Sequence, residues 1–189
     1  MPTSQIIAFV LCVMCSTAKC YGQIGIFPTN DTYTDSANPL SNFGSESELR
    51  IKKSYDGNDD VNAFLSFDLD DVNGSFEQIL LKLSSPNSSH KSVQIKVLPV
   101  GVDENEMTWS NQPTDSEYLF YGGFSIGDTV YFDVTNIVFE KIAQNQTLNL
   151  LLFSNLFDTG SQIFNSKDCL LYTSPSPRDR TRSRMPSSA

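Results

Sequence analysis

Cysteine, histidine and tryptophan are scarce in this chain of 189 residues, which has four cysteines, one histidine and one tryptophan. Three cysteines, Cys12, Cys15 and Cys20, lie in or beside an apolar N-terminal run, and Cys169 lies in the C-terminal tail. The sequence between them therefore has no disulfide framework and no thiolate metal site. It must rely on its core, which is feasible because a chain of about 146 residues buries roughly 68–70% of its unfolded surface.

Basic residues are also few. Between Gln23 and Asp168 the chain has 21 acidic and 8 basic residues, a formal charge of −13. This net negative charge opposes binding to nucleic acid and to anionic membrane surfaces, because both carry dense negative charge. We therefore expect no nucleic acid and no membrane as a partner, and a polyanionic glycan only where the few cations cluster.

Long apolar runs are absent as well, since none approaches the roughly 20 residues that span a bilayer. The run Ile6–Val13 is followed by small residues and then by polar chain, the pattern of a secretory signal peptide, although no Lys or Arg precedes it. We expect residues 1–22 to be a signal peptide, cleaved after Ala18 or Gly22, and the protein to be secreted and extracellular. A buried N-terminal strand or helix is the alternative.

The other end of the chain changes composition abruptly. The runs CLLYTSPSPRD (Cys169–Asp179) and RMPSSA (Arg184–Ala189) resemble a translated sequencing adapter, and the last 21 residues contain four Arg after an acidic chain. We expect residues 169–189 to be an artefactual tail, which leaves residues 23–168 as a single domain that is truncated at its C-terminus. The alternative is an Arg- and Ser-rich tail that binds nucleic acid or is phosphorylated.

Short runs of alternating apolar residues, separated by turn residues, continue through the domain. The alternation is clearest in Leu49–Lys52 and Val93–Val97, and Phe64–Leu69 and Leu148–Phe153 indicate buried strands. Turn residues such as those in DGN and TG separate these runs. The stretch Thr135–Gln144 has helical spacing, with Thr135 as its N-cap. The pattern predicts an all-β, two-sheet antiparallel β-sandwich with one short helix.

Several short runs carry a family resemblance when they are taken in order. They are PTNDTYTDS, NFGS (Asn42–Ser45), FLSFDL (Phe64–Leu69), TWSNQP (Thr108–Pro113), YFDVTNIV (Tyr131–Val138) and IFNSKD (Ile163–Asp168). Over Phe27 to Asp168 the chain resembles the DNRLRE family of extracellular β-sandwich modules. The resemblance implies a jelly-roll-like fold and a carbohydrate-binding role without catalysis, and some members bind acidic glycans such as alginate.

The resemblance predicts a secreted, non-catalytic carbohydrate-binding module that brings an attached enzyme or cell-wall protein to a polysaccharide, acidic polysaccharides included. No cofactor is required for that role. One alternative is a structural cell-surface or matrix sandwich that contacts other proteins. The other is an appendage of a polysaccharide lyase or hydrolase whose catalytic domain lies outside this sequence.

Four polar residues are candidates for contacts with a glycan. Arg50 and Lys52 alternate with apolar residues on one strand, and Gln94 and Lys96 do so on another. If these strands are neighbours on the open face of a sheet, the four side chains form a basic and polar strip. Such a strip could bind uronate or sulfate groups, with the Arg guanidinium making bidentate contacts. The alternative is a pair of ordinary solvated strand faces.

Two positions depart from the pattern that the resemblance implies for binders of acidic glycans. Asn62 and Ser66 flank the FLSF run where Arg or Lys is frequent in the family. Alginate in particular is therefore an unsupported ligand. Trp109 is interpreted as a packing residue at the end of the sandwich, with stacking on a sugar ring as the alternative.

The sequence contains no set of residues that favours catalysis. His90 is the single histidine, in a polar loop, without the nucleophile and orienting carboxylate that a catalytic base needs. Asp103, Glu104 and Glu106 are interpreted as a solvated loop. Asp68 and Asp133 follow Phe in FD pairs and are interpreted as structural residues that tie strand ends to loops.

Calcium is considered at DGNDD (Asp56–Asp60). This run lacks the glycine and the distal glutamate of a calcium loop, since Val61 and Phe67 stand there, so a charged hairpin turn is the interpretation. Asp residues are numerous enough for a structural calcium ion elsewhere, at a place that the sequence does not locate. With the signal peptide, N-glycans are expected at four sequons. These are Asn30, Asn73, Asn87 and Asn145.

Overall fold

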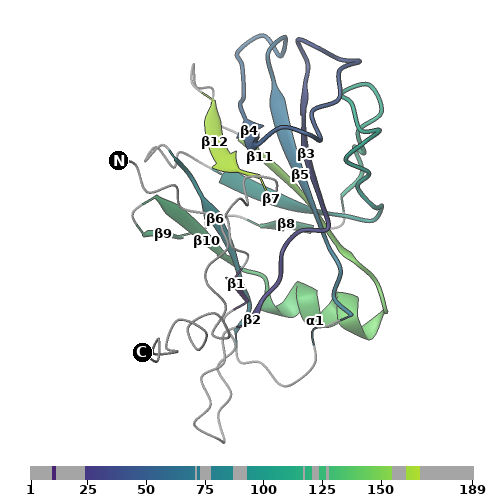
Figure 1. The fold of residues 1–189 in the computed structure, drawn as a ribbon, viewed down its shortest axis with the longest axis vertical. Helices are drawn as coiled ribbons and strands as arrows, with labels where there is room; N and C mark the ends of the chain where they lie inside the picture. The colour runs from purple at the N-terminus through teal and green to yellow at the C-terminus, as the bar shows by residue number, and fades with distance from the viewer. Residues whose placement is uncertain are drawn as a thin grey trace, which may run out of the picture.

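The computed structural model describes residues 10–11, 24–70, 72, 78–86, 93–116, 118–120, 124–126, 128–154 and 161–166. These residues form two layers of antiparallel strands with one helix at an end of the sandwich (Figure 1). The prediction of an all-β sandwich with a single short helix is confirmed. Residues 167–189, which include the whole of the expected tail (residues 169–189), lie outside the described residues.

One layer is a five-stranded sheet with the strand order β3-β5-β11-β7-β8. Its strands are β3 (Asn30–Asp35), β5 (Val61–Phe67), β11 (Leu148–Ser154), β7 (Val93–Leu98) and β8 (Tyr118–Phe120). All four pairings are antiparallel. Strands that are distant in sequence are therefore neighbours in space, as a two-layered sandwich with crossing connections requires.

The other layer consists of a three-stranded sheet, β6-β10-β9, and a pair, β12-β4. These strands are β4 (Glu48–Ile51), β6 (Leu80–Ser84), β9 (Phe124–Ile126), β10 (Thr129–Asp133) and β12 (Gln162–Asn165). A single bridge between Lys52 and Val61 joins the end of β4 to β5 in the first layer. A further short pair joins β1 (Val10–Leu11) to β2 (Ile24–Gly25). The removal of residues 1–22 as a signal peptide stays a prediction.

The main core lies between the two layers. Alternation puts Leu49 and Ile51 of β4 inside, while Arg50 between them is exposed. On the facing sheet, Val93, Ile95 and Val97 of β7 are buried against them in the same apolar cluster. Each such side chain contributes roughly 1.5–3 kcal/mol relative to an exposed one. The alternation in the sequence therefore identified the inner face of both layers correctly.

A second, smaller core lies on the outer face of the five-stranded sheet. Phe64 of β5 pairs with Leu151 of β11, and both side chains are buried although they point away from the main core. They are covered by Val102 and Met107, which belong to the chain between β7 and β8. We call residues 99–116 the crossing segment. In Figure 1 it is the teal trace beside β3 and β5.

Residues from the β3–β4 connection hold the crossing segment in place. The Asn42 side chain donates hydrogen bonds to the carbonyl oxygens of Glu104 (2.7 Å) and Met107 (2.8 Å). Gly44 allows this close approach, because a Cβ at that position would lie 1.9 Å from the Glu104 carbonyl oxygen. The Ser110 hydroxyl donates to the carbonyl oxygen of Pro39 (2.9 Å). The NFGS run therefore serves the fold as an anchor for a segment far away in sequence.

The helix α1 (Thr135–Ala143) follows β10 and packs Ile137 and Val138 against the main core. The predicted N-cap is wrong, since Val134 occupies that position and makes no side-chain cap bond. Thr135 is instead the first helical residue, and its hydroxyl accepts the Ile79 N–H (2.8 Å). The Thr135 hydroxyl therefore serves a contact with the residue before β6 and does not cap its own helix.

Asp133 performs the local capping at this junction. Its Oδ1 accepts hydrogen bonds from the Thr135 N–H (3.0 Å) and hydroxyl (2.6 Å), and its Oδ2 accepts one from the Gln78 amide (3.0 Å). Partial burial opposes the charged form of Asp133, but these bonds outweigh it and hold its pKa below the ordinary value. The interpretation of Asp133 as a structural residue at a strand end is confirmed.

Candidate functional site

The four residues of the predicted basic strip lie in different layers. Arg50 and Lys52 belong to β4 and its end, whereas Gln94 and Lys96 belong to β7. Since β4 pairs with β12 and β7 pairs with β11 and β8, the two strands are not neighbours. The condition for a single strip is therefore not met. Alternation shows which residues share a strand face, but it does not show which strands share a sheet.

Each described cation of the four already has a partner within the protein. Arg50 forms an ion pair with Glu48 (3.2 Å), and its guanidinium lies 5.7 Å from the centre of the Tyr33 ring. Lys96 has its ammonium 5.0 Å from the centre of the Phe153 ring. A cation held over an aromatic face gains electrostatic stabilisation from the ring. The two glycan contacts proposed for these residues remain predictions.

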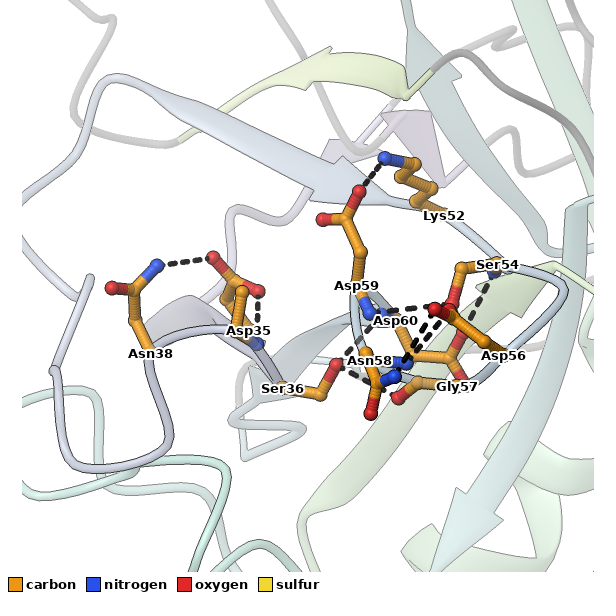
Figure 2. Close-up of polar contacts among 11 residues, drawn as sticks. Asp35, Ser36, Asn38, Lys52, Ser54, Asp56, Gly57, Asn58, Asp59 and Asp60 are labelled. Carbon is orange, nitrogen blue, oxygen red and sulfur yellow. Dashed lines mark hydrogen bonds and ion pairs between the residues drawn. The ribbon is translucent and has the colours of Figure 1, made fainter.

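Lys52 and Gln94 are less accessible still. Lys52 forms an ion pair with Asp59, as Figure 2 shows. Gln94 is only 8% exposed, so its side chain presents little surface to a ligand. The positions Asn62 and Ser66 lie on the outer sheet face and are used internally: Asn62 donates to Gln112 (3.3 Å) and Ser66 donates to Asn149 (2.5 Å).

We call residues 53–60 the acidic turn, which joins β4 to β5. The polar contacts of this turn converge on Asp60, which is 7% exposed. Asp60 Oδ1 accepts hydrogen bonds from the N–H (2.7 Å) and hydroxyl (2.9 Å) of Ser54, and Oδ2 pairs with Lys53. Burial raises the pKa of Asp60, but the contacts with Lys53 and Ser54 outweigh burial and lower its pKa overall.

The remaining carboxylates of the acidic turn are also engaged. Asp56 accepts two hydrogen bonds from Asn58, each 3.1 Å, and these bonds lower the pKa of Asp56. Gly57 has a φ of +74°, which a glycine adopts without strain. Figure 2 shows the carboxylates directed to these separate partners. The charged-turn interpretation fits this geometry, and no group of three metal-ligating side chains occurs among the residues that the structure describes.

A cavity is lined by both limbs of the crossing segment, which are the outgoing limb (residues 99–107) and the return limb (residues 111–115). Its volume is about 480 Å³. It is lined by Pro99, Val100, Gly101, Asp103, Glu106, Met107, Asn111, Gln112, Pro113, Thr114 and Asp115. We call it the cleft. Its lining combines apolar side chains with amide and carboxylate groups, and it is connected to the second core through the buried Met107.

The polar groups of the cleft differ in how they are engaged. The Gln112 Oε1 accepts hydrogen bonds from the Thr34 hydroxyl (2.8 Å) and from Asn62, which fixes the return limb over β3 and β5. Asp103 accepts the Asn105 N–H (2.9 Å) and so shapes the outgoing limb. In contrast, no described residue donates a hydrogen bond to the carboxylate of Glu106 or Asp115. Those two groups are available to a ligand.

The interpretation of residues 103–106 as a solvated loop is correct only in part. Asp103 and Glu106 are exposed, but the Glu104 carboxylate accepts the Asp31 N–H (3.0 Å) and so ties the segment to β3. Trp109 is partly buried and belongs to neither apolar cluster. The cleft itself was missed, although the TWSNQP run supplies several of its residues and anchors.

Two predicted sequons can be placed. Asn145 is exposed just after α1 and has a φ of 54°, a conformation that Asn tolerates. Asn30 is half-buried at the start of β3. Asn73, Asn87 and the single histidine, His90, lie outside the described residues.

Comparison with known proteins places this fold in one family. The family model of carbohydrate-binding module family 96 matches residues 23–171, which include every described strand except β1. No curated protein matches the chain. No helix in the described ranges is long and apolar enough to cross a membrane.

Proposed function

Because the chain belongs to carbohydrate-binding module family 96, we propose that it binds a polysaccharide in the cleft of the crossing segment and does not cleave it. The observation that carries this proposal is the cleft itself. Ligand sites are concave, occupy roughly 300–1,000 Å³, and combine apolar walls with a few polar groups. A cleft of about 480 Å³ with this mixture of side chains fits that description.

The lining suits a sugar ring in two ways. Val100 is 48% exposed, and with the half-buried Pro113 it offers an apolar surface to the C–H face of a ring. Glu106 and Asp115 can accept hydrogen bonds from hydroxyl groups, and bonds to charged acceptors contribute about 1.5–3 kcal/mol each. Binding along a polymer then requires only that the cleft be open at its ends.

Three of the described carboxyls are poorly suited to act as the acid of a glycosidase. A glycosidase needs a carboxyl whose pKa is raised so that it can donate a proton. Asp56, Asp60 and Asp133 have their pKa values lowered, and all three are used in the acidic turn or at the start of α1. Hydrogen bonds that stabilise a carboxylate make it a poor acid.

The proposal includes an extracellular location and the finer family identity. Modules of this kind are commonly extracellular, and we propose that residues 1–22 direct secretion and that residues 23–168 form the DNRLRE-like domain. Asn145 is the better-placed of the two described sequons, because its side chain is exposed. A structural calcium ion and attached catalytic or repeat domains also remain proposals.

Gly101 offers a direct test of the cleft. A Cβ at this position meets no atom within 4 Å, so the first side-chain atom can be added without a clash. Gly101→Trp should fill the cleft, abolish binding to immobilised polysaccharides and leave the melting temperature unchanged. Gly101→Ala is the matched control and should bind as the unmodified chain does. Unimpaired binding by Gly101→Trp would contradict the proposed place of binding.

The absence of catalysis has its own measurement. The full chain is incubated with each polysaccharide that it binds, and reducing ends and unsaturated uronates are quantified over time. We expect neither product to rise above the level of a heat-denatured sample. A product that appears with the native chain and disappears with Gly101→Trp would show an enzyme that acts in the cleft.

A further inference from the structure

The charge of the cleft determines which polysaccharides can enter it. Three of its described lining residues are acidic, namely Asp103, Glu106 and Asp115, and none of the lining residues that the structure describes is Lys, Arg or His. The whole domain, with the cleft included, has a formal charge of −13 over residues 23–168. An anionic chain that enters the cleft therefore meets charges of its own sign without a compensating cation.

The cations of the described residues do not offer a second route for an anionic chain. Arg50, Lys52 and Lys53 form ion pairs with Glu48, Asp59 and Asp60. Lys96 lies over the Phe153 ring, Lys141 is buried and donates to Gln146 (3.2 Å), and Lys82 lies on β6. Three of these cations neutralise carboxylates of the protein itself, and the described cations are spread over both layers. Bidentate capture of a uronate or sulfate by clustered cations, as anion sites require, has no basis in this geometry.

We propose that the cleft is selective for uncharged glycan chains and that Glu106 and Asp115 reject chains bearing carboxylate or sulfate groups. This inference rests on the proposed binding in the cleft and deepens it. The same two carboxylates favour neutral glycans and disfavour anionic ones. Each can accept hydrogen bonds from neutral hydroxyl groups, and each repels an anion at the same place. Specificity built on repulsion is a common means of separating similar ligands.

Salt provides a test that needs no variant. Repulsion between exposed charges is screened as the Debye length falls from about 10 Å at 0.1 M salt to about 3 Å at 1 M. Binding to an anionic polysaccharide should therefore rise with salt, whereas capture by clustered cations would fall with salt. Binding to a neutral polysaccharide should change little. Repulsion and capture by clustered cations thus predict salt effects of opposite direction. The full, unmodified chain is sufficient to distinguish them.

The probe is one polymer in two charge states, methyl-esterified polygalacturonate and its de-esterified form, with neutral mannan, xylan and mixed-linkage glucan in parallel. The backbone of the first pair is the same, so a difference in affinity reports the carboxylates. We expect the chain to bind at least one neutral polymer and to bind the de-esterified form least. Affinity electrophoresis or calorimetry at 0.1 M and 1 M salt measures each dissociation constant.

Charge-neutral variants locate the effect. The double variant Glu106→Gln and Asp115→Asn keeps the size of both side chains and should raise affinity for de-esterified polygalacturonate by roughly five- to tenfold. Affinity for a neutral polymer should change by less than that. Asp128→Asn is the matched control, because Asp128 is exposed in the turn between β9 and β10 of the other layer. That variant should change neither affinity.

The outcomes separate the two proposals. If the chain binds no polysaccharide, both the proposed function and this inference fall. If it binds the anionic polymer most tightly, with affinity that falls as salt rises, the inference is overturned while carbohydrate binding stands. The same holds if the double variant and Asp128→Asn have equal effects, since the rejection would then arise from the net charge alone.

Discussion

The acidic turn and the described lining of the cleft each contain three acidic residues, but they engage them differently. In the acidic turn, Asp56, Asp59 and Asp60 each have a hydrogen-bond or ion-pair partner nearby. In the cleft, Glu106 and Asp115 have none among the described residues. Acidic content alone therefore says little about function. What distinguishes a structural carboxylate from one available to a ligand is whether the fold already supplies its donors.

The difference has an energetic origin. Asp60 is buried, and a buried charge must be paired and hydrogen-bonded if the fold is to tolerate it. Glu106 and Asp115 are exposed and keep their water, so they need no protein partner. The following changes would sharpen or break this contrast, and they are ordered from the largest expected effect to the smallest.

The largest effect is expected for Asp60→Ala. The change removes the acceptor of the Ser54 N–H and hydroxyl and leaves Lys53 without its partner. We expect the free energy of unfolding to fall by about 3 kcal/mol. Denaturant unfolding measures it, with Asp115→Ala as the comparison. A loss of stability for Asp115→Ala that matches that of Asp60→Ala would remove the distinction between the two regions.

Met107→Ala tests whether the packing of Met107 in the second core supports the cleft. Met107 is 6% exposed and packs with Phe64 and Leu151 in the second core. Truncation of a buried Met costs at least about 2 kcal/mol, and here it also removes part of the cleft wall. We expect lower stability and weaker polysaccharide binding together, measured by thermal unfolding and affinity electrophoresis. Full binding at reduced stability would show that the cleft does not depend on this side chain.

Low pH should remove the contribution of the acidic turn to stability. The pKa of Asp60 in the folded protein lies below its ordinary value, so its contribution to stability is complete above the unfolded pKa of about 3.9. That contribution is lost as the pH falls through the folded pKa. We expect the free energy of unfolding to decrease in acid below about pH 4, and Asp60→Asn to flatten that decrease. An identical pH profile for the variant would exclude Asp60 as a cause.

The smallest effect is expected for Lys52→Ala. The Lys52–Asp59 pair is partly solvated, with the Asp59 side chain 51% exposed, and such pairs contribute about 0–1 kcal/mol. If Lys52 serves the turn and not a ligand, polysaccharide affinity should stay the same. A clear loss of affinity in electrophoresis would return Lys52 to the set of glycan-binding residues and would place binding outside the cleft.

Much of the fold could be predicted from local patterns. Alternation in Leu49–Lys52 and Val93–Val97 correctly gave strands and their inner faces, and the helical spacing after Asp133 correctly gave α1. Both are properties of neighbouring residues. The helix N-cap was predicted one residue too late. A local pattern does not show that the Thr135 hydroxyl accepts a hydrogen bond from Ile79, a residue distant in sequence.

The site could not be predicted in the same way. Whether β4 and β7 share a sheet depends on the order of strands, which alternation does not encode. The crossing segment has no regular structure, and its position depends on contacts such as those of Asn42 with Glu104 and Met107. The apolar residues on both faces of β5 and β11 were the available signal. They indicate that something covers the outer face, but not what covers it.

The arrangement of the crossing segment also bears on how such a module could diversify. The contacts that hold it use Asn42, Gly44 and Ser110, whereas Val100, Glu106 and Asp115 line the cleft. For these residues anchoring and recognition are separate, whereas Met107 and Gln112 both line the cleft and hold the segment. Substitutions at Val100, Glu106 and Asp115 can alter the accepted sugar at little risk to the scaffold, so that new specificities become accessible through single mutations, by selection or by design.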